Sequence, residues 1–227
     1  MICPIDPQSD KAIADHSPQQ VIHTLCREAK QLIRQGDLSS ARRLLERGLG
    51  EKPRSVAIRS QLAALALRMD DLVTARRHWE MVVSIDPLHA QGLANLGVIA
   101  FREENLDQSA DFLRRAIQID PSQAGAYYNL GLVYRKQGRV SLAIQSYRQA
   151  FEKDPGLVDA GLNLANIYFE QQKFSLAKRC YEQVLRAAPT FMRAKVGLAR
   201  VSKLISETAK VEPTPIIKFP RRAARKP

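Results

Sequence analysis

The stretch AYYNLGLVYRKQGRVSLAIQSYRQAFEKDP, residues 126–155, contains two runs of apolar residues at helical spacing. Gln137-Gly138 separates the two runs and is typical of a turn. The stretch ends in Asp154-Pro155. Because proline has no N–H to donate and disfavours helix in the residue before it, the second helix is expected to stop there. The stretch therefore predicts two helices joined by a short turn.

The same pattern recurs along most of the chain with a fixed period. Prolines recur every 34 residues, at Pro53, Pro87, Pro121, Pro155 and Pro189. A period between about 20 and 50 residues indicates stacked supersecondary units. Aligned on these prolines, the chain divides into five blocks, 22–55, 56–89, 90–123, 124–157 and 158–191.

Each block has a small residue at a fixed place in its first helix and another in its second. The first-helix set is Ala29, Ala63, Gly97, Gly131 and Ala165, and the second-helix set is Ala41, Ala75, Ser109, Ala143 and Ala177. Small side chains at these places allow the paired helices to approach closely, while neighbours such as Trp79 and Tyr147 fill the space beside them.

Block 124–157 closely resembles the tetratricopeptide repeat (TPR) family. The residues that match the family pattern are Tyr127, Leu130, Gly131 and Tyr134 in the first helix, and Ala143, Tyr147, Ala150 and Pro155 in and after the second. The resemblance extends over about three-quarters of the chain. It implies an all-α fold, a right-handed α-solenoid of helix-turn-helix repeats, in which the first helices line a concave surface.

The N-terminal end departs from the repeat. Ser17-Pro18-Gln19-Gln20 combines an N-cap serine, a first-turn proline and a reciprocal glutamine, so the first helix is expected to begin near Pro18. Residues 1–16 contain Pro4 and Pro7 and have no sustained apolar periodicity, so they are expected to be flexible.

The C-terminal end departs as well. Residues 192–208 resemble the first helix of a repeat, but no second helix follows, and Lys195 replaces a bulky residue; this fits a capping helix with a polar face. Five helix pairs and this cap would make eleven helices in one solenoid over residues 17–209. Residues 210–227 contain four prolines and a basic cluster and are expected to form an unstructured tail.

The net charge of +12 is distributed unevenly. Residues 192–227 hold ten Lys and Arg against two Asp and Glu, and residues 22–55 hold eight against four. Such a distribution bears on partners and solubility rather than on fold. The three cysteines are odd in number and far apart, which argues against a disulfide framework, so Cys26 and Cys180 are expected to be reduced thiols packed on helices.

The sequence contains no pattern typical of an enzyme. GLANLG, residues 92–97, lacks the lysine of a phosphate-binding loop and lies within a repeat helix. The histidines have no partners at metal-ligand spacing. We therefore expect no catalytic residue, metal or cofactor. No apolar stretch is long enough to span a membrane and no secretory signal is apparent, so a cytoplasmic location is expected.

Asparagine occupies the same first-helix position in three successive blocks, at Asn95, Asn129 and Asn163. An Asn amide can both donate to the C=O and accept from the N–H of an extended peptide. On the concave surface that the resemblance implies, these residues would bind peptide backbone. The alternative is that the amides bond locally or face water.

Other predicted groove residues are Tyr128, Phe101 and Asn166. Aromatic and amide side chains suit the anchoring of a peptide, although Phe101 would also suit partial burial between repeats. A second row contains Arg34, Arg68, Arg102 and Lys136, followed by Glu170. Arg102 and Lys136 would suit an acidic or phosphorylated segment, or serve only to complement the helix dipole.

The leading prediction is an adaptor or scaffold that binds an extended or helical peptide segment of a partner protein in the concave groove. The alternative is an accessory protein for nucleic acid or an anionic surface. Its phosphate contacts would come from Lys218, Arg221, Arg222, Arg225 and Lys226. No aromatic stacking platform accompanies this cluster, which weakens the alternative. Self-association through the uncapped first block is a third hypothesis.

Overall fold

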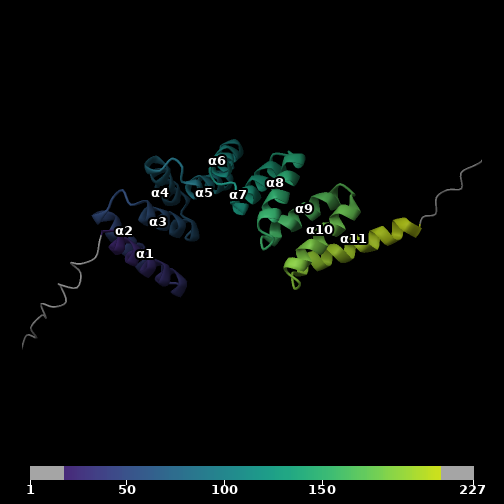
Figure 1. Ribbon diagram of the computed structural model, residues 1–227, viewed down its shortest axis with the longest axis horizontal. Helices are drawn as coiled ribbons and strands as arrows, with labels where there is room; N and C mark the ends of the chain where they lie inside the picture. Colours follow the sequence, from purple (N-terminus) through teal and green to yellow (C-terminus); the bar gives the residue numbers. More distant parts are fainter. Residues whose placement is uncertain (1–17, 211–227) are drawn as a thin grey trace, which may run out of the picture. The chain divides into compact units, whose positions relative to one another are not determined.

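A computed structural model describes residues 18–210 of the chain, with side chains from 19 to 208. Within this range the chain forms eleven helices and no strand, which confirms the predicted all-α class (Figure 1). The helices are α1 (Pro18–Gln35), α2 (Leu38–Glu51), α3 (Val56–Arg68), α4 (Leu72–Ile85), α5 (Ala90–Arg102), α6 (Leu106–Ile119), α7 (Ala124–Lys136), α8 (Val140–Lys153), α9 (Val158–Glu170), α10 (Phe174–Ala187) and α11 (Met192–Lys210). None of these helices is long and apolar enough to span a bilayer.

The chain divides into two compact units, Met1–Ser146 and Tyr147–Pro227, with the boundary inside α8. In the described range the first unit contains α1 to α7 and the start of α8, and the second contains the end of α8 and α9 to α11. A single continuous solenoid over residues 17–209 stays a prediction.

Within each unit, first helices pack against the second helices that follow them. The pairs α3–α4 and α5–α6 in the first unit and α9–α10 in the second make extensive contact. First helices of successive repeats are also neighbours, because α5 contacts α7 in the first unit and α9 contacts α11 in the second. The first helices therefore form a common surface within each unit.

The positions predicted to be small are all buried. A Cβ atom added to Gly97 would lie 2.6 Å from Cγ of Leu113, so only glycine allows α5 and α6 to approach this closely. Opposite it, the buried hydroxyl of Ser109 donates to the Gly97 carbonyl oxygen over 2.6 Å. A hydrogen bond at this small position links the two helices of the repeat without leaving a buried hydroxyl unpaired.

The turn between the two helices of a repeat has the same backbone conformation in all five repeats. One residue of each turn has a positive φ: Gly36 (85°), Asp70 (61°), Glu104 (66°), Gly138 (73°) and Gln172 (60°). The backbone N–H of the residue after it donates to a carbonyl near the end of the first helix. The Asp71 N–H, for example, donates to the carbonyl oxygen of Ala66 over 2.9 Å. This conformation suits glycine, so Asp70, Glu104 and Gln172 hold it under strain.

Candidate functional site

The predicted asparagine residues lie on first helices of both units. Asn95 on α5 and Asn129 on α7 belong to the first unit, whose helices α5 and α7 are in contact, and Asn163 on α9 belongs to the second. All three side chains are partly exposed. The Asn95 amide donates to the Gln91 carbonyl oxygen over 2.8 Å, which is the local bonding that the sequence left open. Peptide binding by this row stays a prediction.

Two basic residues of the second row, Arg102 and Lys136, connect successive repeats. Arg102 forms an ion pair with Asp70, and Lys136 forms one with Glu104 at 2.8 Å. The Lys136 ammonium group also lies 5.5 Å from the centroid of the Phe101 ring, which is partly buried. The acids that pair with these cations are the positive-φ residues of the turns. Arg102, Lys136 and Phe101 therefore have structural contacts between repeats, whether or not they also bind a ligand.

Of the other predicted site residues, Tyr128 is partly exposed on α7. The basic residues of the tail, Lys218, Arg221, Arg222, Arg225 and Lys226, lie outside the described residues.

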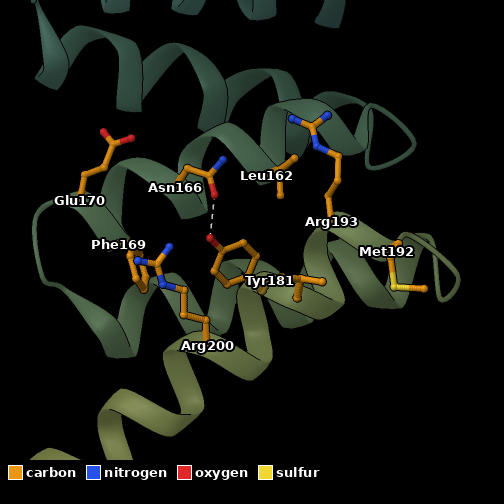
Figure 2. Close-up of a pocket in the computed structure, with 10 residues that line it drawn as sticks. Leu162, Asn166, Phe169, Glu170, Tyr181, Met192, Arg193 and Arg200 are labelled. Carbon is orange, nitrogen blue, oxygen red and sulfur yellow. Dashed lines mark hydrogen bonds between the residues drawn. The ribbon is translucent and has the colours of Figure 1, made fainter.

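Asn166 is part of a pocket in the second unit, which we call the α9–α11 pocket (Figure 2). Its volume is about 640 Å³. The lining residues are Leu162, Asn166, Phe169 and Glu170 from α9, Tyr181 from α10, and Met192, Arg193, Val196, Gly197 and Arg200 from α11.

The pocket combines an apolar interior with exposed apolar side chains at its edge. Leu162 and Tyr181 are buried, and Phe169 is partly buried. Met192 and Val196, in contrast, leave 64% and 61% of their surface exposed. Large apolar side chains that stay this exposed beside a hollow are typical of a binding surface.

A hydrogen bond fixes the polar group at the centre of the pocket. The Tyr181 hydroxyl donates to Oδ1 of Asn166 over 2.7 Å, as the dashed line in Figure 2 shows. This bond turns Oδ1 of Asn166 towards Tyr181, so the amide NH₂ points away from Tyr181 and can donate to another group. Burial raises the pKa of Tyr181, against the opposing effect of nearby Arg200, so the hydroxyl keeps its proton at neutral pH.

The position of α11 depends on one glycine. A Cβ atom at Gly197 would lie 2.5 Å from ring carbons of Tyr181, so glycine is required for α11 to pack against α10 here. Arg193, Val196, Gly197 and Arg200 follow the spacing of one helix face. Close packing at Gly197 therefore directs both arginines and Val196 towards the pocket.

The two arginines are held in different ways. The Arg200 guanidinium carbon lies 4.6 Å from the centroid of the Phe169 ring, which is a cation–π contact. Nη1 of Arg193 lies 3.3 Å from Oδ1 of Asp159, in a single hydrogen bond. Both guanidinium groups keep donors that these contacts do not use.

The sequence predicted Asn166 as a groove residue but assigned α11 only a capping role. In the structure α11 provides half of the residues that line the pocket. The spacing of Arg193, Val196, Gly197 and Arg200 is the pattern from which this face could have been found.

Three family models match the chain. A TPR repeat model matches residues 97–138, and two tetratricopeptide repeat models match residues 124–157 and 162–202. Together with the helix pairs and their small buried positions, these matches show that residues 97–202 consist of tetratricopeptide repeats. Proteins of this family are generally protein-interaction scaffolds. No curated protein sequence matches the chain.

Solved structures with the same fold include proteins of several kinds. PilF of Pseudomonas aeruginosa is 16% identical with a TM-score of 0.75, over 85% of this chain and 87% of that one. PilW, described as a type IV pilus biogenesis factor, is 19% identical with a TM-score of 0.69, over 85% and 96%. A thermophilic TPR protein of Thermus thermophilus is 24% identical with a TM-score of 0.63, over 80% and 99%. At these identities the likeness concerns the fold alone.

Proposed function

We propose that the chain is a scaffold that binds a peptide segment of a partner protein on its first helices, with the α9–α11 pocket as the anchoring point. The observation that carries this proposal is the pocket itself. Two first helices, α9 and α11, border an apolar hollow with exposed Met192 and Val196 at its edge.

The size and lining of the pocket suit part of a peptide. A volume of about 640 Å³ falls within the range of small-ligand sites and would hold one or two side chains. Burying one large apolar side chain contributes about 1.5–3 kcal/mol. The NH₂ group of Asn166 is positioned to donate to a peptide carbonyl, which would add about 0.5–1.5 kcal/mol.

The asparagine row would supplement this anchor. Asn95, Asn129 and Asn163 have partly exposed amides on first helices, and an extended peptide offers them a backbone donor and acceptor at every residue. Because each such bond is weak in net terms, we expect the row to add affinity with little sequence preference.

The proposal can be tested with peptides selected from a random phage-displayed library on the immobilised full-length chain. Fluorescence anisotropy would then measure the affinity of the selected peptides for variants. Val196→Asp places a carboxylate at the edge of the apolar hollow and is expected to weaken binding at least about tenfold, or about 1.4 kcal/mol. Replacing Asn95, Asn129 and Asn163 together with Ala should cause a smaller loss.

A matched control is Val73→Asp on α4, because Val73 is 78% exposed and lies outside the pocket. This variant should bind as the parent does, and circular dichroism should confirm that all variants fold. The proposal is wrong if no peptide is selected, or if Val196→Asp binds the selected peptides as tightly as Val73→Asp.

A further inference from the structure

We propose that the peptide recognised by the α9–α11 pocket carries an acidic residue within two positions of a bulky apolar one. This inference rests on the proposed function and adds the chemistry of the partner. Two observations support it. Arg193 and Arg200 are only partly compensated by negative charge, and the exposed side chain of Val196 lies between them on α11.

Arg200 is oriented but not neutralised. Its guanidinium group is stacked on Phe169, and no carboxylate within residues 19–208 forms an ion pair with it. Stacking uses a face of the guanidinium plane and leaves the N–H donors at its edge available. A carboxylate is the group that this edge binds best, because it accepts two parallel hydrogen bonds.

Arg193 is only partly compensated. One of its nitrogens contacts Asp159 at 3.3 Å, and its side chain is 66% exposed. Arg76 in the first unit differs, because it forms ion pairs with both Glu80 and Glu103. The arginines at the pocket therefore keep a capacity for anions that a fully paired arginine lacks.

The charge around the pocket favours an acidic partner over a basic one. The lining contains two guanidinium groups against one carboxylate, that of Glu170, and Asp159, which is not part of the lining, contacts Arg193 through a single hydrogen bond. Lys195 on the same helix is also exposed. The tail of this chain contains the apolar run Ile216-Ile217, but the arginines that follow it would meet like charge here. A segment of a partner with carboxylate side chains fits better than this chain's own C-terminus.

The spacing on α11 sets how close the acidic and apolar groups must be. Val196 lies between Arg193 and Arg200 on one helix face, about one turn from each. One turn rises about 5.4 Å, whereas an extended peptide rises about 3.3 Å per residue. A carboxylate on an arginine and an apolar side chain against Val196 therefore come from residues one or two positions apart in the peptide.

The experiment uses the same random phage-displayed library and compares pools selected on the parent and on Arg200→Gln. Pools from the parent should be enriched in Asp or Glu within two positions of Leu, Ile, Met, Phe, Tyr or Trp. Pools from Arg200→Gln should lose that enrichment. For a consensus peptide, replacing its acid by the matching amide should weaken binding to the parent about tenfold.

The control variant is Arg186→Gln on α10, an exposed arginine outside the pocket lining. It should preserve the preference for the acidic peptide, whereas Arg200→Gln should bind the acidic and amide peptides about equally. This equality is a readout that loss of folding would not produce, because both peptides must still bind.

The outcomes separate this inference from the proposed function. If the selected peptides lack acidic residues but still lose affinity for Val196→Asp, the pocket binds peptides and the acidic preference is wrong. If no peptide depends on Val196, the proposed function itself is wrong. If binding appears only after residues 211–227 are removed, the pocket belongs to this chain's own tail, and the inference of an acidic partner is overturned.

Discussion

Cations on first helices have different surroundings in the two units. In the first unit, Arg102 and Lys136 each pair with an acid of the preceding turn, Asp70 or Glu104, 32 residues earlier. In the second unit the turn carries the neutral Gln172, and the position 32 residues later is Leu204. The cations of α11 that border a pocket, Arg193 and Arg200, are instead compensated weakly or by an aromatic ring.

The difference teaches that one scaffold uses the same residue type for two purposes. A cation within reach of the preceding turn links repeats, because an acid there is held in place by the backbone. A cation one turn closer to the helix start, as Arg200 is relative to Leu204, faces the pocket instead. Where a basic residue lies in the repeat therefore decides whether it pairs with the acid of the preceding turn or borders the pocket.

The largest expected effect comes from a substitution that moves α11, because it would displace Arg193 and Arg200 from the pocket. Gly197→Ala places a methyl group against the Tyr181 ring, so the helix must shift. Overpacking of this kind costs about 1–3 kcal/mol. We expect faster hydrogen exchange in α11 and lower stability of the second unit in urea, together with loss of peptide binding.

Gly50→Ala is the matched control for this change. Gly50 is exposed near the end of α2, and a Cβ atom there would meet nothing within 4 Å. Alanine should stabilise that helix by about 0.5–1 kcal/mol. If Gly197→Ala also stabilises the chain, the Tyr181 ring does not constrain α11 and the positions of Arg193 and Arg200 need another cause.

An intermediate effect is expected where the strained turns differ between the units. Gln172→Gly relieves an unfavourable backbone conformation and should raise the free energy of unfolding by about 1 kcal/mol. Glu104→Gly relieves the same strain but also removes the partner of Lys136, so its gain should be smaller. Urea unfolding of both variants measures the difference; equal gains would mean that the ion pair contributes nothing.

The smallest effect is expected from removing only the ion pair between Lys136 and Glu104, which measures how much such a pair contributes in the first unit. The hydrogen bond from Lys136 lowers the pKa of Glu104. A carboxyl whose folded pKa is lowered stabilises the fold above its unfolded pKa, about 4.3, and this contribution is lost as the pH falls through the folded pKa. Glu104→Gln should therefore reduce Tm slightly at neutral pH, and the difference should shrink below about pH 4 and at high salt.

The second unit contains a natural control for that measurement. The ion pair between Lys203 and Glu207 is longer, at 3.9 Å, and both side chains are well exposed. Glu207→Gln should change Tm less than Glu104→Gln does. A larger change for Glu207→Gln would contradict the assignment of Glu104 as a link between repeats.

Much of the fold could be predicted because the same residue pattern recurs in five blocks. Pro18 opens α1 as the capping residues indicated, and the helices end before the periodic prolines. Gly36 and Gly138 are 102 residues apart, which is three repeat periods, and Asp70, Glu104 and Gln172 share their register. The two glycines therefore also indicate the strained conformation at these three residues. Periodicity can thus predict a backbone conformation that the residue type alone does not favour.

The candidate site was harder to predict because it arises where the repeat stops. A helix without a second partner indicates a cap, and nothing in the repeat pattern says which of its faces a ligand could reach. The hydrogen bond between Tyr181 and Asn166 depends on the packing of α10 against α9, which residue spacing does not fix in detail. The ion pairs of Arg102 with Asp70 and of Lys136 with Glu104 could not be predicted either, because residues 32 positions apart meet only through the packing of the helices.

The buried thiols give each unit its own chemical reporter. Cys26 lies in α1 and Cys180 in α10, both reduced, and burial raises the pKa of each, that of Cys180 to about 11. Since the thiolate is the reactive form and both sulfurs are buried, alkylation requires local opening of the surrounding helices. In a chain whose Cys3 is replaced by Ser, the labelling rates at these two sulfurs would record the local opening of the two units separately.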